Sequence, residues 1–238
     1  MNLEEFKSFF KEELEKNNLD TEIDYEFFYT YMKEILEWNE KINLTAIKDE
    51  KEFIVKHFVD SLTISSLVKN TDSVIDVGTG AGFPGIPLKI THKDLEICLL
   101  DSVNKKIMVL NDIIEKLSLN NVETIHSRVE DIAHMELYRE EFDIATSRAV
   151  SNLTTLSEYL LPLVKVGGRV ICMKGPNYEE EVNESKNAIK ILGGKIEKVI
   201  SLNIDEELER NIIIINKIKK TPSKYPRNSG LPLKKPLK

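Results

Sequence analysis

Long apolar runs, metal-binding motifs and a cysteine framework are all missing from this chain of 238 residues. No run approaches the roughly eighteen apolar residues of a membrane-spanning helix. The first ten residues, MNLEEFKSFF, include no basic n-region, so we expect neither a signal peptide nor a membrane anchor. Metal-ligand spacing is also missing from the four histidines, so we expect no metal site; these are His57, His92, His126 and His134.

Cysteine is scarce, with Cys98 and Cys172 each inside an apolar run. Such residues are typical of buried free thiols in a reducing compartment, and we expect a cytoplasmic protein. A disulfide or a catalytic thiol is the weaker alternative.

The net charge of −7 disfavours a nucleic-acid partner, but the charge is unevenly distributed. The chain from residue 217 onward contains no acid and eight bases, which leaves −15, eight below the net value, for residues 1–216. A basic tail on an acidic body favours a polyanionic partner, and a solvated tail that aids solubility is the alternative. The eight are Lys217, Lys219, Lys220, Lys224, Arg227, Lys234, Lys235 and Lys238.

Apolar residues recur at helical spacing through residues 1–70, with Asp24 as a candidate cap and a third helix expected over 49–69. From Ser73 onward strands and helices alternate, which predicts a parallel sheet with helices on both faces and an antiparallel final pair. We expect ligand at the carboxyl ends of the early strands. The predicted strands are 73–78, 96–101, 122–127, 142–147, 169–174, 196–204 and 210–218, and the helices between them are 104–117, 154–164 and 179–192.

A glycine-rich loop, VIDVGTGAGFPG, follows the first predicted strand. Its glycines, Gly78, Gly80, Gly82 and Gly85, leave room for a backbone to approach a ligand closely, although a simple tight turn is the alternative. The loop also fits the dinucleotide fingerprint GxGxxG, with Asp101 near the expected distance to hold ribose hydroxyls. The fingerprint alone therefore does not separate a nicotinamide enzyme from an S-adenosylmethionine (SAM) enzyme.

Three features favour SAM. Asp76 inside the strand suits a ligand with an ammonium group, and little chain remains for a dehydrogenase's substrate domain. Glu130, after the third predicted strand, is suited to accept a hydrogen bond from an adenine amine. The alternatives are a helix N-terminal acid at Glu130 and a solvated strand-end acid at Asp101.

Two sequence signatures of nucleic-acid methyltransferases are missing, and their absence narrows the choice of methyl acceptor. The loop TSRAVSN has no proline, whereas exocyclic-amine methyltransferases commonly carry a polar-Pro-Pro-aromatic motif there. Neither cysteine lies in a loop that would present the nucleophile of pyrimidine carbon-5 chemistry. Guanine N7 carries no proton, so its methylation needs no general base and depends on alignment. It is therefore a good candidate acceptor.

Eight segments, spread through most of the chain, resemble the RsmG (GidB) family of 16S rRNA guanine-N7 methyltransferases. The upstream WNEKINLT and the terminal YPR segment are the most specific, because generic methyltransferases lack them. Lys105–Lys106 stands where a Lys-Arg pair is expected, which weakens only a claim of bidentate phosphate contact there. The segments are WNEKINLTAI from Trp38, HFVDSL from His57, VIDVGTGAGFPGIPLKI from Val74, LLDSVNKKIMVL from Leu99, SRVEDIA from Ser127, FDIATSRAVSNL from Phe142, LPLVKVGGRVICMKG from Leu161 and KYPRNSGLPLKKPL from Lys224.

The resemblance implies an α/β protein: a Rossmann-like SAM-dependent methyltransferase sheet of about seven mostly parallel strands with an N-terminal helical extension. We divide the chain into a helical cap (1–70), a methyltransferase core (71–218) and a basic tail (219–238). The implied target is guanine-527 of 16S rRNA, with the small ribosomal subunit as partner, and we expect a monomer. The predicted cofactor-binding residues are Gly78, Gly80, Phe83, Asp101, Val129, Glu130 and Arg148.

Arg148 is our first choice for a role at the reacting centre, where it would orient SAM or an RNA phosphate; a structural ion pair is the alternative. Asn39 and Thr45 are as suited to capping as to positioning ligand, and His57 fits a structural role near an apolar face. Three other functions stay open: an NAD-dependent oxidoreductase, a non-catalytic RNA-binding protein, and a SAM-dependent methyltransferase with a different substrate.

Overall fold

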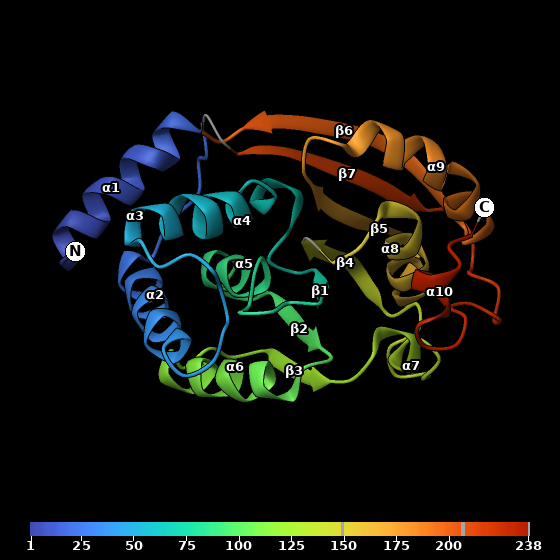
Figure 1. Ribbon diagram of the computed structural model, residues 1–238, viewed down its shortest axis with the longest axis horizontal. Helices are drawn as coiled ribbons and strands as arrows, with labels where there is room; N and C mark the ends of the chain where they lie inside the picture. Colours follow the sequence, from blue (N-terminus) through green and yellow to red (C-terminus); the bar gives the residue numbers. More distant parts are fainter. Residues whose placement is uncertain (149, 206–207, 238) are drawn as a thin grey trace.

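A seven-stranded sheet forms the centre of the computed structural model, which describes residues 1–148, 150–205 and 208–237 (Figure 1). The strand order is β3-β2-β1-β4-β5-β7-β6. Strands β1 to β5 pair in parallel, and β7 runs antiparallel to both β5 and β6. The predicted fold is therefore confirmed. The strands are β1 (Ser73–Val77), β2 (Glu96–Asp101), β3 (Val122–His126), β4 (Phe142–Arg148), β5 (Val164–Lys174), β6 (Gly194–Asn203) and β7 (Glu209–Lys217).

Helices cover both faces of the sheet because its strand residues are apolar on both faces. In β1, Val74 packs into the core on one face and Ile75 into the core on the other. The first face carries α1 (Leu3–Lys16), α2 (Tyr25–Asn39), α3 (Glu50–Phe53), η1 (Ile54–Val59), α4 (Asp60–Leu62), α5 (Gly85–Thr91) and α6 (Asn104–Lys116). The second carries α7 (Val129–Ile132), α8 (Leu153–Leu160), η3 (Leu161–Leu163) and α9 (Tyr178–Ile191).

The N-terminal helices begin at side-chain caps. Asn2 and Glu5 form a reciprocal capping box at α1, and the Asp24 carboxylate accepts from the backbone N–H of Phe27 at α2, as predicted. Buried aromatic rings, including Phe10 and Phe58, then pack edge to face or at tilted angles between these helices and the sheet. The Tyr31 hydroxyl ties α2 to the glycine loop by donating to the Ala81 carbonyl at 2.5 Å.

The third predicted helix begins near its predicted start but was predicted too long. Helical structure runs from Glu50 to Leu62, and a short 3₁₀ turn, η2 (Ser65–Leu67), follows. Its six central residues, 54–59, form a wider π-helical segment, a feature that frequently marks functional sites. Hydrophobic spacing cannot reveal such a local widening, because the same apolar residues remain buried.

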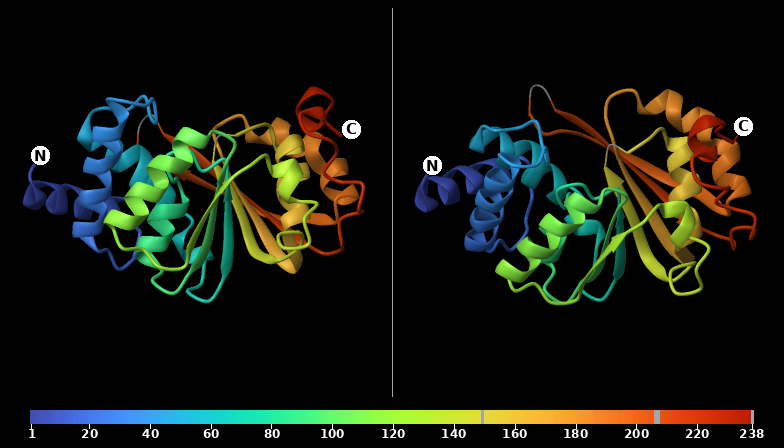
Figure 2. Two further views of the ribbon diagram at one scale, coloured as in Figure 1. Left: turned by 90° about the horizontal axis from the view of Figure 1, so that it is seen from below. Right: turned by 60° about the horizontal axis from the view of Figure 1, so that its bottom comes forward.

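The C-terminal residues after β7 fold back against α7 and α8, and end near the short helix α10 (Leu231–Lys234). In both views of Figure 2, this end of the chain lies opposite the N-terminal helices. Two of the eight bases have buried or half-buried ion-pair partners: Lys217 is buried against Glu140 and the Leu161 carbonyl, and the half-buried Arg227 pairs with the buried Glu158. Lys238 lies outside the described residues. Across the described parts of the chain, no helix is long and apolar enough to cross a membrane.

Candidate functional site

A pocket opens at the carboxyl ends of β1 and β2, where the topology predicts ligand. It has about 630 Å³ of empty space, part of which is open to solvent. Four of the predicted cofactor-binding residues line it together: Gly78, Asp101, Val129 and Glu130. The other lining residues are Val77, Leu100, Ser102, Ser127, Arg128, Val150, Ser151, Tyr159 and Leu233.

Asp101 ends β2 and is buried, with 5% of its surface exposed, so it is not a solvated acid. One carboxylate oxygen accepts from the Gly80 backbone N–H at 3.0 Å, and the other accepts from the Val103 N–H at 2.9 Å. Lys106 Nζ lies 3.6 Å away. Because two carboxylate oxygens offer about four acceptor sites, Asp101 fixes the glycine loop and retains capacity for the hydroxyl groups of a ribose.

Glu130 lies in α7 and is 4% exposed. Its Oε1 accepts from the Gly230 backbone N–H at 2.8 Å, which joins the C-terminal segment to the pocket. Burial raises the pKa of the Tyr159 phenol to about 12, and the neighbouring Glu130 carboxylate adds to the increase. Sequence reasoning identified Glu130 but missed Tyr159 and Gly230, which reach it from segments distant in the sequence.

Asp76 lies behind the glycine loop and does not line the pocket. Its Oδ2 accepts from the Thr79 hydroxyl at 2.7 Å and the Gly85 N–H at 3.0 Å. The Oδ1 atom is buried and has no hydrogen-bond partner among the described residues. Burial raises the pKa of Asp76 to about 6, although these hydrogen bonds oppose the increase. Asp76 thus stabilises the loop from within, and its suitability for a ligand ammonium stays a prediction.

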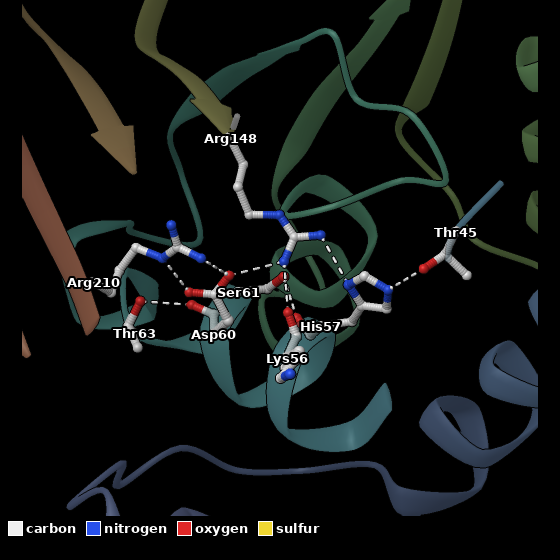
Figure 3. Close-up of polar contacts among 8 residues, drawn as sticks. All are labelled: Thr45, Lys56, His57, Asp60, Ser61, Thr63, Arg148 and Arg210. Atoms are coloured by element: carbon white, nitrogen blue, oxygen red, sulfur yellow. Dashed lines mark hydrogen bonds and ion pairs between the residues drawn. The ribbon is translucent and has the colours of Figure 1, made fainter. Parts of the chain in front are cut away.

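Arg148 ends β4 and reaches into the helix that contains the π segment (Figure 3). Its Nη1 donates to the Lys56 carbonyl at 3.0 Å and to Asp60 Oδ2 at 2.9 Å. The fully buried Asp60 also accepts two hydrogen bonds from Arg210, at 2.6 and 2.8 Å. The structural ion pair considered for Arg148 is therefore present, and one carboxylate holds two guanidinium groups.

Phe83 lies with Arg148 rather than in the pocket. The His57 ring stacks on the Phe83 ring, with centroids 4.4 Å apart and planes 10° apart. Arg148 Cζ lies 5.0 Å from the centroid of the same ring, in cation–π range. The predicted cofactor-binding residues therefore form two groups: those at the pocket, and Phe83 with Arg148 at the other end of the glycine loop.

Both ring nitrogens of His57 make hydrogen bonds. Nδ1 lies 3.1 Å from Arg148 Nη2, and Nε2 lies 2.8 Å from Thr45 Oγ1. Arginine has no acceptor, so Nδ1 must accept, and the ring proton of a neutral His57 lies on Nε2. Burial first, and then the Arg148 charge, lower the pKa of His57 to about 3. Asn39 fixes the turn at Thr45 through hydrogen bonds to its backbone N–H and carbonyl.

Both cysteines are buried free thiols, as expected. Burial raises the pKa of both thiols, that of Cys172 to about 12, so neither forms a ready thiolate nucleophile. Within the described residues, no group of histidine, cysteine, aspartate or glutamate side chains could hold a metal ion.

The sequence matches the GidB family, described as rRNA small subunit methyltransferase G, over residues 24–213. A ribosomal RNA small subunit methyltransferase G from Clostridium beijerinckii is 54% identical over 217 residues, which is 90% of this chain and 91% of the relative. One from Clostridium perfringens is 52% identical over the same shares.

Solved structures with low sequence identity share the fold. A SAM-dependent methyltransferase from Aquifex aeolicus aligns with a TM-score of 0.53 and 19% identity, covering 76% of this chain and 97% of its own. A SAM-dependent O-methyltransferase from Thermotoga maritima aligns with a TM-score of 0.54 and 15% identity, covering 81% and 73%.

The depressed pKa of His57 predicts a specific pH dependence of stability. In the unfolded chain His57 has its ordinary pKa of 6.5, so as the pH falls the unfolded chain takes up a proton at His57 before the folded chain does. The stabilisation from a neutral His57 is therefore complete above about pH 7 and is lost as the pH falls from 6.5 towards 3. Between about pH 7.5 and 5.5, wild type should lose about 1 kcal/mol more unfolding free energy than His57→Asn.

The measurement is urea denaturation at both pH values. The asparagine variant is the matched control, because its side-chain oxygen keeps an acceptor for Arg148 without a group that titrates. Parallel pH profiles for the two proteins would show that His57 is not held neutral.

Proposed function

Because the chain belongs to the rRNA small subunit methyltransferase G (GidB) family, we propose that it transfers a methyl group from SAM to N7 of guanine-527 in 16S rRNA. SAM dependence and a methyltransferase activity on small-subunit rRNA follow from family membership. The assignment of N7 as the methylated atom and of guanine-527 as the nucleotide goes beyond family membership. It rests on the chemistry of the site and on the resemblance described above.

The pocket offers groups that suit the adenosyl part of SAM. Its buried carboxylates, Asp101 and Glu130, suit the hydroxyl and amine donors of an adenosine, and Val77, Leu100 and Val129 supply apolar walls. Asp101 alone would serve either cofactor, because dinucleotide enzymes also place an acid at this strand end, and Arg128 and Lys106 add positive charge beside the two carboxylates. When bound, SAM supplies an electrophilic methyl group on a sulfonium centre. Membership of a methyltransferase family is the observation that favours SAM over a nicotinamide cofactor.

Methylation at guanine N7 agrees with the side chains around Arg148. The acceptor nitrogen carries no proton, so alignment can replace general-base catalysis. His57 has both ring nitrogens engaged and a pKa lowered to about 3, which makes it unsuitable as a base. The raised pKa of each cysteine likewise argues against covalent catalysis on a pyrimidine. We therefore assign orientation of the reactants, rather than proton transfer, to the residues around Arg148.

The substrate partner we propose is 16S rRNA, within the small ribosomal subunit, and we propose a cytoplasmic monomer. The exposed Lys234 and Lys235 provide positive charge near the pocket, since they directly follow Leu233, which lines it.

The direct test incubates the protein with tritiated SAM and small subunits that lack the modification, and then maps the methylated nucleotide. We expect label at N7 of guanine-527. In parallel, thermal unfolding should show stabilisation by S-adenosylhomocysteine and no shift with NADH. Label at another nucleotide would overturn the assigned target, and stabilisation by NADH alone would favour an oxidoreductase.

Arg148→Ala should slow single-turnover methyl transfer by on the order of tenfold or more, because it removes a fixed, multiply hydrogen-bonded cation near the reacting centre. Arg148→Lys is the control that keeps the charge but loses the planar fork. Circular dichroism should check that both variants fold, because each removes hydrogen bonds to the buried Asp60 carboxylate. An unchanged single-turnover rate in a folded Arg148→Ala protein would limit Arg148 to a structural role.

The double variant Lys234→Glu/Lys235→Glu should weaken RNA binding and reduce the slope of log affinity against log salt by about two. The matched control is Lys7→Glu/Lys11→Glu on α1, at the opposite end of the molecule (Figure 1). Filter binding across a salt series measures both. Equal losses for the two variants would indicate only a change in net charge.

A further inference from the structure

The C-terminal segment, residues 221–237, is anchored to the protein through buried contacts. Glu158 in α8 is fully buried, and Arg227 binds it as a fork, with Nε 2.9 Å from Oε1 and Nη2 2.7 Å from Oε2. The Arg227 backbone N–H donates to the same carboxylate at 2.8 Å. A bidentate pair to a buried carboxylate fixes both position and orientation. The segment is therefore held at a defined place on α8.

A second anchor holds the segment just before this pair. Arg139 donates to four backbone carbonyl groups, three of which belong to residues 221, 222 and 225. His134 Nε2 lies 2.7 Å from the Pro226 carbonyl oxygen, and the Tyr225 ring is buried in the core of the second face. These contacts direct the chain towards α7, which carries Glu130.

Beyond the anchors, the segment reaches the pocket at two points. The Gly230 N–H donates to Glu130 Oε1 at 2.8 Å, from a backbone conformation with φ of +77° that favours glycine. Pro232 is buried, and its carbonyl accepts from the Thr155 hydroxyl. Leu233, next along the chain, lines the pocket together with Val129 and Tyr159.

We propose that residues 221–237 form one wall of the SAM pocket, with Leu233 packing directly against the bound adenosyl group and Gly230 acting as a positioning residue for Glu130. This rests on the proposed function only in taking the pocket as the SAM site. Leu233 is 60% exposed, although it lines a pocket with apolar walls. A planar heterocycle in the pocket covers that apolar surface, which is a favourable transfer from water.

The bond from Gly230 has a further consequence for Glu130. It occupies one carboxylate oxygen and thereby fixes the plane of the carboxylate, while the other oxygen keeps acceptor capacity. One segment, residues 221–237, therefore both forms this wall and orients the Glu130 carboxylate. If docking of the segment on α8 strengthens ligand binding, then ligand binding must strengthen docking of the segment by the same factor.

The first experiment is calorimetry with S-adenosylhomocysteine on the full chain. Leu233→Ala should weaken binding by about tenfold, from the loss of buried apolar contact. Leu231→Ala, in the same short helix but not lining the pocket, is the matched control and should bind as wild type does. Both side chains are exposed, so both variants should fold and melt normally.

The second experiment is limited trypsin digestion, followed at Lys224 and Lys234. S-adenosylhomocysteine should slow cleavage at these exposed sites in wild type and protect Leu233→Ala much less at equal occupancy. Equal affinity of Leu233→Ala and wild type, or equal weakening by the two alanine variants, would overturn the proposal. Failure of wild type itself to bind S-adenosylhomocysteine would instead overturn the assignment of the pocket, and so the two failures are distinguishable.

Discussion

The glycine loop between β1 and α5 is packed tightly on both sides, and the geometry of the candidate site depends on that packing. A Cβ atom at Gly82 would lie 2.6 Å from the Tyr31 hydroxyl, and one at Gly78 would lie 2.5 Å from Val150 Cγ2. Both glycines also have positive φ, which other residues rarely adopt. The loop is thus confined between the N-terminal helices and the turn after β4. Its backbone is also fixed by hydrogen bonds from the Gly85 N–H to Asp76 and from the Gly80 N–H to Asp101.

The helices before the sheet explain how Arg148 is held in place. Asp60 accepts hydrogen bonds from Arg148 and from Arg210, which lies 150 residues later in the chain. A buried carboxylate is costly unless its partners satisfy it, and two guanidinium groups do so here. The π segment adds the Lys56 carbonyl and His57 as acceptors for the same arginine. An N-terminal extension that sequence shows only as apolar periodicity therefore supplies most of the polar contacts of Arg148.

Most of the fold could be predicted from the sequence, because each strand is a short apolar run bounded by turn residues, as in EICLLD for β2. The pocket acids Asp101 and Glu130 could also be predicted, since both follow a strand at the edge where parallel sheets bind ligands. The contacts of Arg148 and the pocket residues Tyr159 and Leu233 could not, because no local pattern encodes side chains that meet across the chain. Charge counting was also insufficient for the C-terminal segment: it identified eight basic residues without distinguishing the exposed lysines from Lys217 and Arg227, which have internal partners.

The two groups of site residues are joined by a very short stretch of chain. Arg148 is the last residue of β4, and Val150, two residues later, both lines the pocket and contacts Gly78. Phe83, at the far end of the same loop, contacts Arg148 and His57 in turn. The loop therefore contacts both the turn after β4, through Gly78, and the Arg148–His57 group, through Phe83.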